Sequence, residues 1–190
     1  YQMTGFDDFL QLKAASFRST RLAVFTGVSG SGKSTAIQWL IQHHPDFQNR
    51  PIERVIGGGL DWTVPAVENG LVVVDDLIRP RELYKLIRLL IRGNQVLLAA
   101  HLHPAWFAPL RIGWSTQLWR TDVNHEKLAR HLKAERIKFT QVALESYCAE
   151  YGSSYLDMFH ILERYPHCSF DRALRLFRKY CRMEQPALNS

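Results

Sequence analysis

One segment near the start of the chain restricts the possible folds more than any other. Residues 27–34 read Gly-Val-Ser-Gly-Ser-Gly-Lys-Ser and fit the pattern G-x-x-x-x-G-K-[ST] at every fixed position. The apolar run 22–25 precedes them and is typical of a strand buried on both faces. A helix is expected over about 33–44, because Pro45 has no amide hydrogen to donate and its ring clashes with the preceding turn. The segment therefore predicts a strand, a glycine-rich turn and a helix in direct succession.

Such a succession creates a site for phosphate groups. Glycines let the backbone amides of the turn point inward, and the amino end of the helix adds its positive dipole. We expect Lys33 to reach the β and γ phosphates of a nucleoside triphosphate and Ser34 to offer a hydroxyl to Mg²⁺. A chance glycine-serine turn is the alternative, and the flanking strand and helix argue against it. The residues expected to bind nucleotide here are Gly27, Val28, Ser29, Gly30, Ser31, Gly32, Lys33, Ser34 and Thr35.

The rest of the first 122 residues alternates between strand and helix patterns. Further apolar runs predict four more strands, at 53–56, 71–74, 95–100 and 114–120. The run 71–74 is so rich in valine that we expect it in the middle of a parallel sheet. Helices are predicted over 80–92 and, as a short amphipathic segment, over 5–17. This half of the chain predicts an α/β fold of three layers, with a five-stranded parallel sheet between helices.

After residue 122 the strand patterns stop. Helices are expected at 124–134, 139–151, 154–163 and 170–182. We therefore expect two domains, a nucleotide-binding core over 1–122 and a small all-helical domain over 123–190.

Composition narrows the functional classes. Hydrophobic residues make up 46% and charged residues 22% of the chain, as in ordinary globular proteins. No apolar run approaches the roughly 18 to 20 residues that cross a bilayer, and the first residues show no leader pattern, so a cytoplasmic protein is expected. The three cysteines lack metal-binding spacing and are expected to be free thiols. The net charge of +6 is compatible with polyanionic partners but does not require them.

Two carboxylates follow the valine-rich strand. We expect Asp75 to help hold Mg²⁺, and Asp76 to polarise the water that attacks a γ-phosphate. Either residue could instead cap the helix that begins soon afterwards, a role that Asp often fills. A second carboxylate beside the metal favours hydrolysis of a nucleoside triphosphate over phosphoryl transfer to a bound metabolite.

Two histidines follow the fourth predicted strand. In extended geometry His101 and His103 would lie on the same face, and one of them, His101 in our interpretation, would contact the γ-phosphate or the attacking water. No carboxylate or cysteine accompanies the pair locally, which argues against a metal half-site. A purely structural pair remains open.

Basic residues recur at helical spacing on two of the predicted helices. Helix 80–92 carries Arg81, Lys85, Arg88 and Arg92. The last helix carries Arg172, Arg175, Lys179 and Arg182. Such a row usually marks a solvated helix face. A nucleic-acid backbone or an acidic protein partner is the alternative.

The order of these parts resembles the additional-strand division of P-loop NTPases, with residues 27–34 as Walker A and Asp75-Asp76 as Walker B. Within that division the chain looks most like a minimal AAA+ ATPase. The resemblance implies ATP and Mg²⁺, a fourth strand between the first and third, and His101 at the sensor-1 position. It also implies a helical lid with Arg172 as the sensor-2 candidate, and Arg111 as a finger that reaches a neighbouring subunit.

Residues 26–35 are also similar to ABC-type ATPases and to gluconate-kinase-like enzymes. An ABC ATPase should carry an LSGGQ-like signature between its nucleotide motifs, and residues 35–74 contain none. A short ABC-derived protein, with His101 as its switch histidine, remains open. We expect a Mg²⁺-dependent ATPase whose nucleotide cycle controls a partner interaction or a homo-oligomer. The alternatives are a small-molecule kinase and a nucleotide-dependent binding module with little turnover.

Overall fold

The computed structural model describes residues 11–57, 62–121 and 123–184, the last three of these without their side chains. The chain divides into two compact units, which meet in the sequence between residues 122 and 123. The division falls where the strand patterns of the sequence end. None of the helices in the described ranges has both the length and the apolar character that crossing a lipid bilayer requires.

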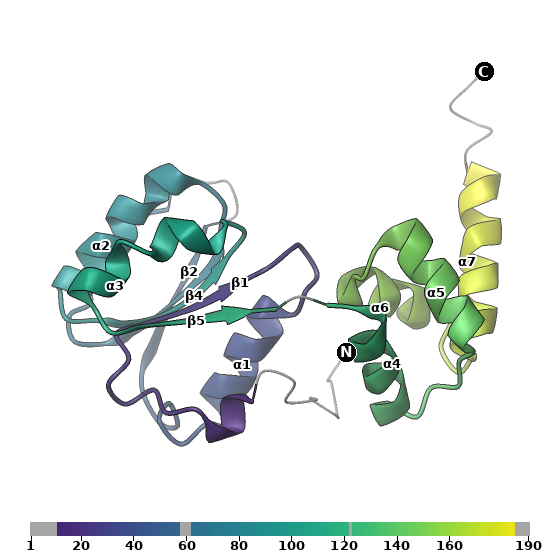
Figure 1. Cartoon of the computed structure of the whole chain (residues 1–190), viewed down its shortest axis with the longest axis horizontal. Helices are drawn as coiled ribbons and strands as arrows, with labels where there is room; N and C mark the ends of the chain where they lie inside the picture. Colours follow the sequence, from purple (N-terminus) through teal and green to yellow (C-terminus); the bar gives the residue numbers. More distant parts are fainter. Residues whose placement is uncertain (1–10, 58–61, 122, 185–190) are drawn as a thin grey trace. The chain divides into compact units, whose positions relative to one another are not determined.

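The first unit is built around a five-stranded sheet in which every pair of neighbours is parallel (Figure 1). Its strands are β1 (Leu22–Thr26), β2 (Ile52–Ile56), β3 (Leu71–Leu77), β4 (Gln95–Ala100) and β5 (Thr116–Arg120). Their order across the sheet is β2-β3-β4-β1-β5, so the expected place of the fourth strand between the first and third is confirmed. Every residue of β1 and β4 is buried, as the continuous apolar runs predict.

Helices cover both faces of this sheet (Figure 1). One face carries α1 (Lys33–His43), and the other carries α2 (Leu83–Ile91) and α3 (Leu110–Gly113). Alternate strand residues such as Val24 and Leu98 join Leu86 of α2 in a single apolar cluster. Parallel strands need such crossover connections, which is why the sheet is covered on both sides. The three-layer α/β architecture is therefore confirmed.

The second unit consists of helices in its described residues. They are α4 (His125–Ala134), α5 (Gln141–Tyr151), α6 (Tyr155–Arg164) and α7 (Phe170–Glu184), and all four predicted helices are confirmed. Three of them begin at a side-chain cap, because Asn124, Thr140 and Ser154 each accept a hydrogen bond from an amide three residues on.

The predicted helix over 5–17 is wrong where it can be tested. Residues 5–10 lie outside the described ranges, and residues 11–17 contain only a 3-10 turn at Leu12–Ala14. Tertiary contacts override the helical pattern here. The Phe17 amide donates to Asp46 Oδ2 at 2.9 Å, and the Phe17 ring lies 5.2 Å from that of Phe47. The helix predicted over 80–92 begins as a second 3-10 turn, Pro80–Glu82, and becomes α2 at Leu83.

Candidate functional site

The glycine-rich loop, residues 27–34, connects β1 to α1 at the carboxyl end of the sheet, where ligands of parallel sheets bind. Gly30 and Gly32 have φ angles of 71° and 88°, which glycine adopts without steric cost. A Cβ on Gly27 would lie 2.5 Å from Thr121 Oγ1, so no side chain fits there. Val28 is 67% exposed at the outer rim of the loop. The loop is thus packed tightly against Thr121 at Gly27 and is exposed to solvent at Val28.

Lys33 lies under this loop and is buried. Its Nζ donates to the carbonyl oxygens of Gly27, at 2.9 Å, and Val28, at 2.7 Å. Burial lowers the pKa of Lys33, while the nearby charges of Asp76 and Asp75 act in the opposite direction. An ammonium group that is shielded from solvent binds anionic oxygens more strongly than an exposed one does.

Ser34 and Asp75 connect the end of the glycine-rich loop to the end of β3. The Ser34 hydroxyl donates to Asp75 Oδ1 at 2.8 Å, across 41 residues of sequence. Hydroxyl and carboxylate oxygens are ligands that Mg²⁺ prefers. In the described part of the chain, no three His, Cys, Asp or Glu side chains cluster to hold a metal by themselves. Mg²⁺ at nucleotides needs only one or two carboxylates together with phosphate oxygens, so Ser34 and Asp75 fit that ion.

Asp76 is turned toward the end of β4. The ladder between β3 and β4 shifts between Val74 and Leu77, and Asp76 has a φ of 66°. As a result its Oδ1 lies 2.6 Å from Nε2 of His101, and both side chains are partly exposed. Nearby, the Gly57 amide donates to the Asp75 carbonyl at 2.7 Å, and a Cβ on Gly57 would lie 3.0 Å from the Asp76 carbonyl. Glycine at 57 thus lets β2 approach this bend closely.

The capping alternative for the two carboxylates is wrong, because Arg79 and Glu82 precede the next helical segments at their cap positions. The expectation that His103 shares a face with His101 is also wrong. Strand β4 ends at Ala100, so the extended geometry stops before His103. His103 is exposed and caps the turn Pro104–Phe107, where its Nδ1 accepts from the Ala105 amide at 3.3 Å.

One predicted arginine, Arg111, does not join the loop. Arg111 is exposed on α3 and lines a hollow of about 550 Å³ with the first residues of β5. In the register of the sheet, Thr116 pairs with Leu22, at the amino end, whereas the glycine-rich loop follows the carboxyl end of β1. Arg172 belongs to the second unit, where it is exposed in the first turn of α7.

The prediction of four cations on a common solvated face of helix 80–92 is wrong. Lys85 is buried, with Nζ 2.5 Å from the Trp62 carbonyl oxygen and 5.0 Å from the centre of the Trp62 ring. Arg92 donates to the Pro65 carbonyl oxygen at 2.7 Å. Chain from the 62–67 segment therefore covers part of this face, and only Arg81 and Arg88 remain exposed.

Sequence reasoning missed Thr121, which lies beneath the glycine-rich loop. Its Oγ1 is 2.6 Å from Ser31 Oγ and donates to the Thr26 carbonyl at 3.1 Å. A usable signal existed, since Thr121 follows β5 just as Asp75 and His101 stand at the ends of β3 and β4. The carboxyl ends of parallel strands meet at the same edge of a sheet.

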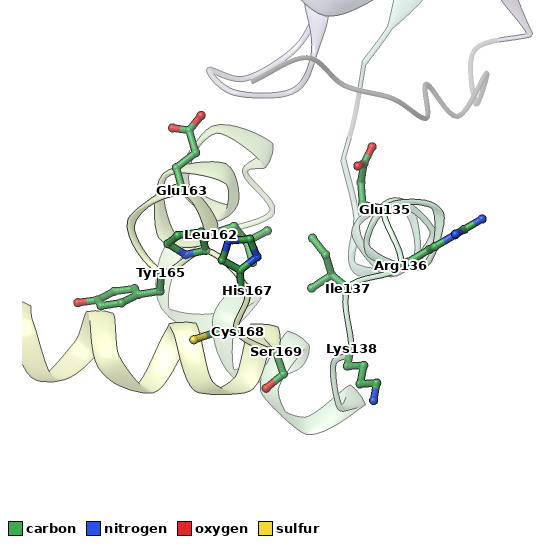
Figure 2. A pocket seen from close by; sticks show the side chains of 11 residues that line it. Glu135, Arg136, Ile137, Lys138, Leu162, Glu163, Tyr165, His167, Cys168 and Ser169 are labelled. Atoms are coloured by element: carbon green, nitrogen blue, oxygen red, sulfur yellow. The ribbon is translucent and has the colours of Figure 1, made fainter.

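A larger hollow, of about 730 Å³, belongs to the second unit (Figure 2). Ile137 and Leu162 face one another across it, while Arg136 and Lys138 point away from its centre (Figure 2). The polar groups therefore do not converge there as they do around the glycine-rich loop, and we assign this hollow no role.

No protein-family model matches the chain, and no curated protein matches it. Function must therefore be argued from the site alone.

Proposed function

We propose that this chain is a Mg²⁺-dependent ATP-binding protein and ATPase of the P-loop superfamily, whose nucleotide cycle controls a partner interaction as in AAA+ modules. The hydrogen bond of 2.8 Å from Ser34 to Asp75 carries this proposal. It joins the last residue of a phosphate-binding motif to a carboxylate near the carboxyl end of β3, the buried strand beyond β4 in the sheet. A chance glycine-serine turn has no reason to meet a carboxylate in this way.

The residues at the carboxyl end of the sheet have different roles in the proposed reaction. Lys33 and the amides of the glycine-rich loop bind the phosphates. Mg²⁺, held by Ser34 and Asp75, would neutralise charge on the phosphoryl oxygens. Asp76 orients and polarises the attacking water, and His101 holds the Asp76 carboxylate through their contact of 2.6 Å.

The same contact supports a second candidate, a nucleotide-dependent binding module with little turnover. Oδ1 of Asp76 is already engaged by His101, which leaves Oδ2 for a water molecule. If the contact with His101 prevents Asp76 from polarising a water molecule, hydrolysis would be slow. ATP would then act mainly by stabilising one conformation of the chain.

The position of Arg111 is the observation that supports assembly in this proposal. Thr116 begins β5 and Arg120 ends it beside the glycine-rich loop, about 13 Å away at the usual rise per residue. Arg111 precedes Thr116, so it lies near the end of β5 that is distant from the loop. In the proposed function Arg111 therefore stabilises the transition state on a neighbouring copy, as a guanidinium can.

Asp76→Asn tests the assignment. Asparagine tolerates the positive φ at this position, so the backbone should be kept. We expect calorimetry to give a Mg²⁺-ATP affinity within about threefold of the wild type, and turnover to fall at least about 100-fold. Asp157→Asn, at an exposed carboxylate of α6, is the matched control and should change neither. A wild-type chain that binds no nucleotide would refute the proposal. Binding without turnover, at every concentration and with candidate partners, would favour the second candidate.

Mixing two inactive variants tests the role of Arg111. Arg111→Ala keeps its own nucleotide site, and Lys33→Ala keeps its own finger, so the mixture should recover part of the lost activity. Wild-type specific activity should also rise with protein concentration. Turnover that is independent of concentration, from a species that light scattering shows to be monomeric with ATP, would exclude a finger supplied by a neighbour.

A further inference from the structure

Ser31 of the glycine-rich loop, Thr121 and the Thr26 carbonyl form a chain of hydrogen bonds to which the proposed function gives no role. Ser31 Oγ lies 2.6 Å from Thr121 Oγ1, which in turn donates to the Thr26 carbonyl at 3.1 Å. A hydroxyl carries one hydrogen, so both contacts are hydrogen bonds at the same time when Ser31 donates to Thr121 and Thr121 donates to Thr26. Ser31 and Thr121 are both 0% exposed. Solvent therefore cannot replace either partner without movement of the loop.

The fit around this chain is tight. The Thr121 amide also donates to the Thr26 carbonyl, at 2.8 Å. A Cβ on Gly27 would meet Thr121 Oγ1 at 2.5 Å and Ser31 Oγ at 2.7 Å. Thr121 thus holds the residue that enters the loop, Thr26, and a residue in its middle, Ser31, across 90 residues of sequence.

Thr121 also stands next to the junction of the two units. The first unit ends at residue 122 and the second begins at Val123, two residues before the first residue of α4. Thr121 is therefore bonded to the glycine-rich loop at Ser31 and stands two positions before the first residue of the second unit. This connection runs along the backbone from Thr121 to Val123, so it is the same for any placement of the two units.

We propose that Thr121 is a positioning residue that holds Ser31 in the arrangement that accepts phosphates and relays nucleotide binding to the junction between the two units. The inference rests on the proposed nucleotide site. Without the Thr121 hydroxyl, the Ser31 hydroxyl would be a buried donor with no acceptor, which is costly, so the loop would shift to hydrate it.

Hydroxyl removal at Thr121 tests the first half of the proposal. We expect Thr121→Val to raise the Mg²⁺-ATP dissociation constant about tenfold, and Thr121→Ser to return it to within about twofold of wild type. Ser31→Ala should cost less, about threefold, because Thr121 keeps its bond to Thr26. Combining Ser31→Ala with Thr121→Val should bind more tightly than Thr121→Val alone, since no donor is stranded. Thr116→Val, at the other end of β5, is the matched control and should not change the affinity.

Hydrogen exchange at amides 123–127 tests the relay. In the wild type, saturating Mg²⁺-ATP should slow exchange at these amides. In Thr121→Val, ATP at a concentration that saturates the variant should no longer slow it, while Thr121→Ser should regain the effect. Urea unfolding must first show that the Thr121→Val variant is folded. In a folded variant, loss of a side chain that only stabilised the fold would leave the exchange response to ATP in place. If Thr121→Val does not fold, Ser31→Ala takes its place, because the proposal requires the response to be lost there too.

The outcomes separate this inference from the function on which it rests. A wild-type chain that binds ATP, together with a Thr121→Val variant of equal affinity or unchanged exchange response, would overturn the role of Thr121 and leave the proposed function intact. A wild-type chain that binds no ATP would overturn both.

Discussion

The two units bury different kinds of side chain. In the sheet unit, four buried polar side chains gather at one end of the sheet, namely those of Thr26, Ser31, Lys33 and Thr121. In the described residues of the helical unit, the one buried polar side chain besides the tyrosines is that of His131, which packs edge-on against the rings of Tyr155 and Phe159. Buried polar groups are costly unless they are partnered. Six other buried polar side chains of the sheet unit lie away from this end, and Gln95, for example, donates to the carbonyls of Phe17 and Thr20. The four at the carboxyl end differ from them in position, because they border the glycine-rich loop. This contrast supports the proposed site in the sheet unit, whereas the helical unit buries mainly apolar side chains in its described residues.

The largest expected effect concerns the helical unit. Phe170 is fully buried, and its ring meets that of Tyr147 at 5.5 Å. Phe170→Ala should lower the free energy of unfolding of this unit by about 3 to 5 kcal/mol, because it leaves a cavity in a close-packed core. Urea unfolding followed by circular dichroism measures this loss. At a temperature where the variant is folded, its ATP affinity should equal that of the wild type. A large loss of affinity would break the division between the units.

Lys33→Ala should weaken ATP binding and leave the stability of the fold almost unchanged, the reverse of Phe170→Ala. Loss of the buried ammonium should weaken ATP binding at least about 100-fold, equivalent to about 2.7 kcal/mol, measured by calorimetry. The midpoint of urea unfolding should change little, because burial already disfavours the charged form of Lys33. Lys133→Ala, at an exposed lysine of α4, is the matched control. Near-native affinity in Lys33→Ala would show that the loop does not bind phosphate.

Sequence patterns predicted the sheet better than the site, for physical reasons. Continuous apolar runs and helical spacing report burial, so the five strands and the four C-terminal helices follow from them. The bend at Asp76 depends on a ladder shift against β4, which no local pattern encodes. The burial of Lys85 depends on the 62–67 segment, whose fold has no periodic signal. Thr121 follows the fifth predicted strand, but only the strand order shows that this strand lies beside β1, which leads into the glycine-rich loop.

Asp46 provides a smaller test within the sheet unit, away from the glycine-rich loop. Burial acts to raise the pKa of Asp46, but the Phe17 amide, Arg18 and His44 outweigh it, and the net pKa is lower than usual. A depressed carboxyl pKa stabilises the fold above the ordinary value near 3.8, and this stabilisation is lost as the pH falls through the folded-state pKa. Asp46→Asn should therefore cost about 1 kcal/mol at pH 7, and the cost should shrink as the pH falls through the folded-state pKa of Asp46. Urea unfolding at a series of pH values measures the difference. A cost that does not depend on pH would show that the Asp46 charge does not stabilise this unit.

The smallest effect sets Thr140 of the helical unit against Thr121 of the sheet unit. The Thr140 hydroxyl accepts from the Ala143 amide at 3.2 Å and donates to Asp171 Oδ1 at 2.5 Å, so it caps α5 and ties it to the first turn of α7. Thr140 is exposed, and water can replace part of what its hydroxyl provides. Thr140→Ala should therefore cost about 1 kcal/mol of unfolding free energy, and Thr140→Ser should recover most of it. Neither should alter the ATP dissociation constant, whereas loss of the Thr121 hydroxyl should raise it about tenfold. Equal effects of the two threonines on ATP affinity would mean that hydroxyl groups serve both units alike, and the contrast between a unit built for a site and a unit built for packing would be wrong.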